Sequence, residues 1–237
     1  MADTRLDNFA TQEEREFIAS VIDGKTDQAL RLGRNLPDGL DTTGKQGRTA
    51  LLLAVMANDR KMVKALLDAG ANPDGGDNAA PLHPAVLDES GELVNMLLKA
   101  GADPNRTYNF ETPLNEAALV GAAGNADRLL DAGADIEKGQ VQLQRSPSIT
   151  GAAADQWQVV VKLIGRGASP YTTDTAGITI AYRAYRSRLK SENPDGQARD
   201  AVAAKFREVG FPWPPPEPKV VKRRIAAGQW PPKLEPQ

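Results

Sequence analysis

The stretch LLKAGADPN, at residues 97–105, is the feature that most restricts how this chain can fold. Similar nine-residue stretches begin at residues 66, 129 and 163, and a weaker copy, KFREVGFPW, occupies residues 205–213. Each of the four strong copies opens with paired apolar residues that suit the end of a helix, and then passes through a glycine into a polar segment. Because these stretches recur at a period in the low thirties, the sequence predicts a stack of helical repeats that bury their core between neighbours.

Spacing within the repeats is constant, whereas spacing between them varies. Short helix starts lie at residues 49, 80, 112 and 146, at intervals of 31, 32 and 34 residues. Apolar residues follow each start by 17 positions, at Leu66, Leu97, Leu129 and Leu163. Glycines follow by 21 positions, at Gly70, Gly101, Gly133 and Gly167. The leucines are therefore predicted to form the core between repeats, and the glycines to take the left-handed conformation just past a helix end.

The helix starts carry recognisable capping chemistry. Thr112-Pro113 and Ser146-Pro147 place a hydroxyl before a proline. The hydroxyl can accept a hydrogen bond from a free backbone N–H, and the proline lacks an N–H only where none is needed. Both pairs therefore predict a helix that begins at the proline.

At this point the pattern resembles the ankyrin repeat, most fully across Ala80-Pro-Leu-His83, Leu97-Leu98 and Gly101-Ala-Asp103. The resemblance is strong over residues 41–174 and weak on either side. It implies an all-α repeat solenoid, in which each repeat has two antiparallel helices followed by a β-hairpin-like loop. It also implies that His83 hydrogen-bonds loop backbone, and that the usual activity is protein–protein recognition without catalysis.

The ends of the chain depart from the repeat. Residues 1–40 are predicted to form a capping helix pair, with a capping box at Thr11–Glu14 and a second helix at about Thr26–Arg34. Residues 175–210 are predicted to form a divergent C-terminal capping repeat, whose two helices are both lengthened around a turn at 191–197. Its glycine arrives at Gly210, ten positions late.

Residues 211–237 form a proline- and tryptophan-rich tail, which the composition predicts to be irregular. Eight of these 27 residues are proline, and the segment carries five basic and two acidic side chains. Such a composition favours extended polyproline II structure. Two interpretations stay open at this stage. The tail is either solvated, or it acts as a strap whose Trp213 and Trp230 pack on the last repeats or on a partner.

Composition argues against most kinds of chemistry. The chain has no cysteine and one histidine, which leaves no thiolate zinc site and no cysteine nucleophile. A lone His83 lacks a placed partner for acid–base catalysis, and no phosphate-binding glycine loop occurs. We therefore expect no enzyme activity, no cofactor and no metal. The net charge of −2 and the short basic run Lys222-Arg223-Arg224 make nucleic acid an unfavoured partner.

The sequence also bears on where the protein works. The first residues are polar and acidic and do not resemble a secretory signal. No apolar run approaches the length of a membrane span. The expectation is a cytoplasmic protein that does not enter a membrane.

The resemblance places a partner protein on the concave face, formed by the inner helices and the hairpin tips. Places eight and nine of each repeat lie on the exposed side of the inner helix. The residues assigned to partner binding are Lys45, Arg48, Met56, Asp77, Leu87, Asp88, Arg106, Tyr108, Asn109, Phe110, Glu111, Leu119, Val120, Gln142, Arg145 and Arg186. Aromatic residues, methionine and arginine are enriched at the centres of interfaces. The alternative is that Leu87 and Leu119 complete the packing between repeats and that Phe110 lies under its loop.

The primary hypothesis is a non-enzymatic module that binds another protein. By resemblance to compact bacterial ankyrin proteins, the finer hypothesis is an immunity or inhibitor protein that neutralises a cognate toxin or effector. A second hypothesis is a structural or assembly protein whose tail docks on a neighbouring subunit. A third is an enzyme hidden in the fifth repeat and tail, for which His83 would be essential.

Overall fold

The computed structural model describes residues 6–76, 79–140 and 142–232. The chain divides into two compact units, which we call unit 1 (Met1–Asn109) and unit 2 (Phe110–Gln237). Within the described ranges every regular element is a helix, and β structure is limited to isolated bridge residues, among them the pairs Gln140–Arg145 and Thr173–Thr179. The expectation of an all-helical repeat architecture is therefore confirmed.

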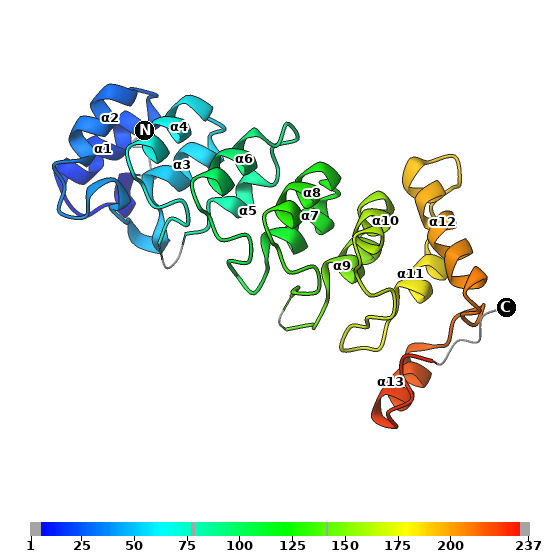
Figure 1. Ribbon diagram of the computed structural model, residues 1–237. Helices are drawn as coiled ribbons and strands as arrows, with labels where there is room; N and C mark the ends of the chain where they lie inside the picture. The colour runs from blue at the N-terminus through cyan, green and yellow to red at the C-terminus, as the bar shows by residue number, and fades with distance from the viewer. Residues whose placement is uncertain (1–5, 77–78, 141, 233–237) are drawn as a thin grey trace. The chain divides into compact units, whose positions relative to one another are not determined.

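Unit 1 begins with the predicted cap and continues with two repeats. Its elements are η1 (Leu6–Asn8), α1 (Gln12–Ile22), α2 (Thr26–Gly33), η2 (Gly39–Asp41), η3 (Lys45–Gly47), α3 (Ala50–Met56), α4 (Arg60–Asp68), α5 (Leu82–Ala85) and α6 (Glu92–Lys99). Figure 1 shows these helices as successive pairs: α1 with α2, α3 with α4, and α5 with α6. The capping box at the start of α1 is confirmed, since Thr11 and Glu14 each satisfy the other's backbone N–H.

Unit 2 holds the next two repeats, the divergent repeat and the tail. Its elements are α7 (Pro113–Val120), α8 (Ala123–Asp131), α9 (Pro147–Ala153), α10 (Trp157–Gly165), α11 (Ile180–Arg186), α12 (Pro194–Glu208) and α13 (Pro218–Ala226). Helices α7, α9 and α11 pack on one another as the inner row, whereas α8, α10 and α12 form the outer row. Helices α7 and α9 both start at the predicted proline, at Pro113 and Pro147.

The repeated leucines and glycines occupy the places that the sequence predicts. Leu66, Leu97, Leu129 and Leu163 are each 0% exposed. Gly70, Gly101, Gly133 and Gly167 have φ between 91° and 100°, which is strained for any residue with a Cβ. The leucines thus hold neighbouring repeats together, and the glycines turn the chain out of each outer helix.

The prediction for the divergent repeat is correct in part. Helix α12 has 15 residues, against nine in α10, but α11 has seven residues and is not lengthened. The predicted turn at 191–197 is correct only for residues 191–193, because α12 already begins at Pro194, where the Asn193 side chain accepts a hydrogen bond from the Asp195 N–H at 2.8 Å. The extra residues therefore extend only the outer helix and the loop before it.

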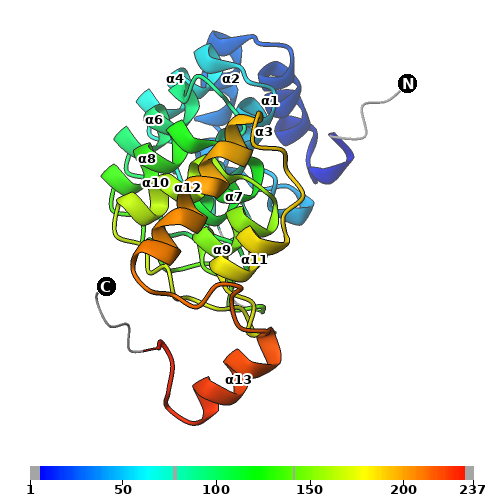
Figure 2. The same cartoon turned by 90° about the vertical axis from the view of Figure 1, so that its right-hand side faces the viewer.

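The tail is irregular only in part, which corrects the prediction from its composition. Residues 218–226 form α13, which lies beside the loop leading into α11 (Figure 2). Contact there is close, because a Cβ on Gly177 would lie 2.7 Å from the Pro218 carbonyl oxygen. Val221 is 0% exposed. Proline suits the first position of a helix, so the proline-rich run ends in a helix start at Pro218.

Both tail tryptophans pack within unit 2, as the strap interpretation expects. The Trp230 indole N–H donates to the Tyr171 carbonyl oxygen at 2.9 Å. The Trp213 ring meets the Tyr185 ring edge-on, with 5.8 Å between centroids, and the Arg207 guanidinium lies 4.9 Å from the Trp213 centroid. The tail therefore completes the C-terminal end of the core of unit 2.

Candidate partner-binding surface

The inner helices bury most of their residues, and the apolar side chains that they expose lie at or just past their C-terminal ends. In unit 1, α3 buries Leu51, Leu53 and Val55, whereas Met56 at its end is 58% exposed. Leu87, at the same place in the next repeat, is 59% exposed. The alternative in which Leu87 completes the packing between repeats is therefore wrong, because most of its side chain faces solvent.

The same places in unit 2 also carry exposed apolar side chains. Leu119 and Val120 end α7 and are 46% and 40% exposed, so Leu119 does not complete the packing between repeats either. On the following inner helices the equivalent residues are Ala153 and Ala154, which are half-buried, and Arg186, which is exposed. Within unit 2 the apolar part of this surface is therefore concentrated on α7.

The hairpin tips contribute two aromatic residues. Tyr108, in unit 1, is 37% exposed, and its ring lies 5.7 Å from the His83 ring at a tilt of 60°. Phe110, in unit 2, is 54% exposed, so it does not lie under its loop. Phe110 also has φ of 68°, in the region that favours glycine, and Asn109 before it has φ of 48°. A two-residue turn with two positive φ values normally carries glycine at the second place, where this chain has phenylalanine.

His83 has the structural role that the resemblance implies. It is 8% exposed, and its Nε2 lies 3.1 Å from the Arg106 carbonyl oxygen. Burial lowers the pKa of His83 below its ordinary value, the hydrogen bond to the Arg106 carbonyl opposes that effect, and the positive charge of Arg106 adds to it. A neutral imidazole therefore holds the hairpin of Arg106 and supports the ring of Tyr108.

Two residues assigned to partner binding serve the fold instead. The Asp88 side chain is 6% exposed, accepts from the Arg60 guanidinium at 3.0 Å and accepts from the Leu93 N–H at 3.2 Å. Burial acts to raise the pKa of Asp88, but its hydrogen bonds, led by the one from Ser90, bring the pKa below the ordinary value. The Arg106 guanidinium donates to the backbone carbonyls of Gly76 and Ala79. Asp88 thus caps α6, and Arg106 joins two hairpins.

Two more assigned residues are tied into unit 2. Glu111 accepts from the Asn115 side chain, and burial raises the pKa of Glu111 despite that hydrogen bond. Arg145 lies 3.4 Å from Asp174, whose side chain is 2% exposed. Both remain half-buried and can border a surface, but their polar atoms already have partners.

The remaining assigned residues stay candidates. Lys45, Gln142 and Arg186 are exposed, and Arg48 is half-buried. Asp77 lies outside the described residues. Sequence reasoning missed Tyr185, which is 48% exposed on α11 next to Arg186. Tyr185 stands seventh in its repeat, whereas the position counting selected only places eight and nine.

The side chains and helices of the described residues bear on metal binding and on membrane crossing. Within it, no three histidine, cysteine or acidic side chains come together in a way that could hold a metal ion. Nor does any helix in the described ranges have the length and apolar character needed to cross a bilayer. What the surface presents is apolar and aromatic side chains on a rigid helical frame, which is suited to packing against another protein.

Residues 18–108 match the family model described as ankyrin repeats in three copies. This match covers most of unit 1. The same helix pairs, buried leucines and left-handed glycines continue through α7–α10 in unit 2. Residues 18–108 are therefore ankyrin repeats, which are generally protein–protein interaction modules and typically non-enzymatic, and unit 2 continues the same architecture.

Proposed function

We propose that this protein binds a partner protein through the exposed ends of its inner helices and the adjoining hairpin tips. The observation that carries the proposal is the recurrence of one feature at one place in the repeat. Met56, Leu87 and Leu119 all stand eighth in their repeats and are 58%, 59% and 46% exposed. Single exposed apolar residues are common on any surface, but recurrence at the same repeat position is not random scatter.

The hairpins support the same proposal. Phe110 combines a bulky ring, an exposed position and a left-handed backbone. Such a conformation costs on the order of 1 kcal/mol or more in a residue with a Cβ, and strain of this kind clusters at functional sites. Tyr108 is held against the His83 ring and so is partly preorganised. Rigid aromatic side chains lose little entropy on binding, which favours both residues as anchors.

A finer version of the proposal is an immunity or inhibitor protein that binds and blocks a cognate toxin or effector. Its support is the resemblance to compact bacterial ankyrin proteins. An inhibitor needs only a surface that covers its target, so the absence of a metal-ligand cluster among the described residues is compatible with it.

The assembly hypothesis receives less support. It requires the tryptophans of the tail to be available to a neighbouring subunit. Trp213 and Trp230 instead contact Tyr185, Arg207, Phe211 and the Tyr171 carbonyl of their own unit. The tail is accounted for by contacts within unit 2.

The experiment compares the proteins that wild type and a surface variant capture from the native host. The variant is Tyr108→Ala with Leu119→Arg, which removes an aromatic anchor and places a charge in the apolar surface. We expect capture of the partner, quantified by mass spectrometry, to fall by at least tenfold. Circular dichroism should show unchanged helicity.

The matched control is Ile225→Arg. Ile225 lies on α13 and is 44% exposed, close to the 46% of Leu119. It therefore introduces the same charge at the same exposure outside the proposed surface, and partner capture should be retained. Equal capture by wild type and the folded double variant would show that the inner-helix surface is not the binding site.

A further inference from the structure

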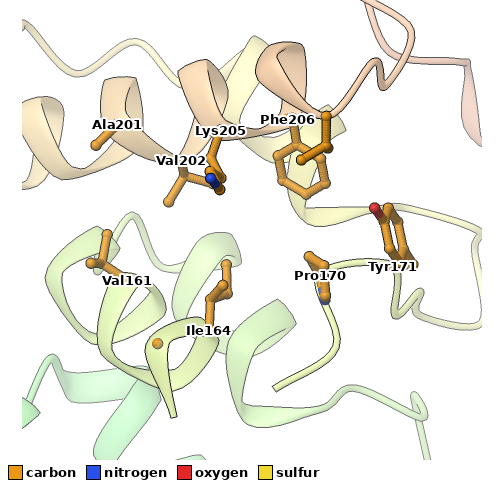
Figure 3. Close-up of a pocket in the computed structure, with 10 residues that line it drawn as sticks. Val161, Ile164, Pro170, Tyr171, Ala201, Val202, Lys205 and Phe206 are labelled. Carbon is orange, nitrogen blue, oxygen red and sulfur yellow. The ribbon is translucent and has the colours of Figure 1, made fainter. Parts of the chain in front are cut away.

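A hollow lies in unit 2, between the outer helices α10 and α12. It has a volume of about 350 Å³. Val161, Ile164 and Pro170 face Val202 and Phe206 across the gap, and Tyr171 stands at one end (Figure 3). Its lining is otherwise made of Gly165, Ala201, Lys205 and Val209. We call this hollow the outer groove. Its lining residues come from the outer helices and one loop, whereas the surface proposed above lies on the inner helices.

The outer groove has an apolar and open wall because α10 departs from the other outer helices at two positions. Val161 stands 15 positions after its repeat start, where the other repeats have Lys64, Asn95 and Asp127. Gly165 stands 19 positions after the start, where the others have Asp68, Lys99 and Asp131. Val161 is 41% exposed, and a Cβ on Gly165 would meet no atom within 4 Å. Val161 makes the wall of the groove apolar, and Gly165 leaves the space beside the α10 backbone empty.

Unit 1 contains the equivalent hollow, which provides an internal reference. It lies between α4 and α6, has a volume of about 400 Å³, and is lined by Lys64, Leu67, Asp68, Met96, Lys99 and Ala100. Lys64, Leu67 and Asp68 are the counterparts of Val161, Ile164 and Gly165. The hollow is therefore a general consequence of packing outer helices, whereas its apolar lining is particular to unit 2.

The outer groove has one charged lining residue among its described neighbours, Lys205. Its ammonium lies 3.1 Å from the Glu208 carboxylate, and the two side chains are 66% and 67% exposed. An ion pair this exposed contributes little, so another carboxylate can take the place of Glu208. The stem of Lys205 follows the apolar wall while its charge stays at the opening.

These features indicate a particular class of ligand. A hollow of about 350 Å³ is at the lower end of the range of small-molecule sites. The lining residues between 201 and 209 span about 12 Å along α12 and its C-cap, at a rise of about 1.5 Å per residue. The hollow is therefore about 12 Å long. A partner helix, about 10 Å across, would rest on the rim without filling the hollow. We propose that the outer groove binds a free aliphatic carboxylate, with its chain between α10 and α12 and its carboxylate at the Lys205 ammonium.

The test uses decanoate as the probe, below its micelle concentration, with the full chain and isothermal titration calorimetry. Wild type should bind it saturably, at one site per chain. Gly165→Leu should abolish binding, because the added side chain enters the empty space. That variant should also keep or increase thermal stability, which separates blocking from unfolding.

Two further arms test charge and position. Decanol and decyltrimethylammonium should each bind about threefold or more weakly than decanoate, and Lys205→Gln should remove the preference for the carboxylate. The matched control is Asp68→Leu, which makes the same kind of change at the counterpart of Gly165 in unit 1 and should leave decanoate binding unaltered.

Three outcomes would overturn the proposal: no saturable binding by wild type, binding that survives Gly165→Leu, or equal affinity for the carboxylate and the ammonium probe. Concentration-dependent self-association that Gly165→Leu removes, without decanoate binding, would assign the groove to a second copy of this chain instead. The result does not depend on the inner-helix surface, because the Tyr108→Ala, Leu119→Arg variant should bind decanoate as wild type does.

Discussion

The hollow between α4 and α6 in unit 1 and the outer groove in unit 2 occupy the same place in the repeat, yet they differ in chemistry. The core beneath both is alike, since Leu66, Leu97 and Leu163 are all 0% exposed. The walls can differ because the outermost positions of the outer helix lie outside the buried core between repeats. Charged residues occupy them in unit 1, and Val161 and Gly165 occupy them in unit 2. A repeat protein can therefore acquire a new surface without altering its core.

The largest expected effect tests whether the two cores are equivalent. Leu97→Ala in unit 1 and Leu163→Ala in unit 2 should each lower the free energy of unfolding by about 2–5 kcal/mol, because each removes a fully buried side chain and leaves a cavity. Urea denaturation monitored by circular dichroism measures the loss. Met56→Ala, at a side chain that is 58% exposed, is the control. If either leucine variant loses no more free energy of unfolding than Met56→Ala, the two cores are not equivalent.

A smaller effect concerns the helix caps of the two units. Thr49 accepts a hydrogen bond from the Leu52 N–H at 3.2 Å, and Thr49→Ala should cost about 1 kcal/mol. Thr112 accepts from the Asn115 N–H at 3.2 Å and also donates to the Lys138 carbonyl at 3.0 Å. Thr112→Ala should therefore cost more, about 2 kcal/mol, at the upper end of the range for lost caps. Thermal melts of both variants measure this. Serine at either position keeps the hydroxyl and should restore most of the stability.

Gly165→Ala should have a smaller effect of opposite sign. Gly165 is the last residue of α10 and its φ is not in the left-handed region, so alanine fits the backbone. Replacing glycine should stabilise unit 2 by about 0.5 kcal/mol, because the unfolded chain loses freedom. The control is Gly167→Ala, two residues on, where φ is 100° and alanine should destabilise. A destabilising Gly165→Ala would mean that the space beside Gly165 is not open.

The smallest expected effect is a pH dependence confined to unit 1. The pKa of His83 is lowered mainly by burial, while its hydrogen bond to the Arg106 carbonyl opposes the shift. Below pH about 6.5, the ordinary value for histidine, the unfolded chain therefore binds a proton that the folded chain resists. The stability associated with neutral His83 is full above that pH and declines as the pH falls below it. The measurement is chemical denaturation of wild type and His83→Gln between about pH 8 and pH 5, the range in which histidine titrates. The free energy of unfolding should decline more steeply for wild type as the pH falls. Parallel curves would contradict this.

The sequence was most informative where a signal repeats. Four copies of a leucine and a glycine at constant offsets cannot be explained by chance, and Leu97 and Gly101 have the burial and the backbone conformation that the copies predict. The exposure of Met56 and Leu87 also followed from their place in the repeat. The same counting wrongly made Asp88 a surface residue, because its carboxylate is engaged by the α6 backbone and by Arg60, 28 positions earlier.

The sequence was least informative where the repeat ends. Proline content predicted an irregular tail, yet proline also starts helices. The structure shows that Pro218 starts one, and that this helix packs closely against Gly177. Tyr185 and the outer groove were missed for other reasons. Tyr185 stands seventh in its repeat, whereas the counting selected only places eight and nine, and the groove depends on α12 facing α10, which no repeat position indicates.

On its own, the amino-acid sequence determined the repeat architecture, the core leucines and the helix-ending glycines. These properties depend on local conformation and on a period that several copies share. Only the tertiary structure decided which polar side chains are engaged in hydrogen bonds within the fold. It also decided that the tail tryptophans pack within unit 2, and that Val161 and Gly165 face α12 across an open groove. These depend on residues far apart in the chain, whose meeting is set by how the outer helices stack and not by any pattern along the sequence.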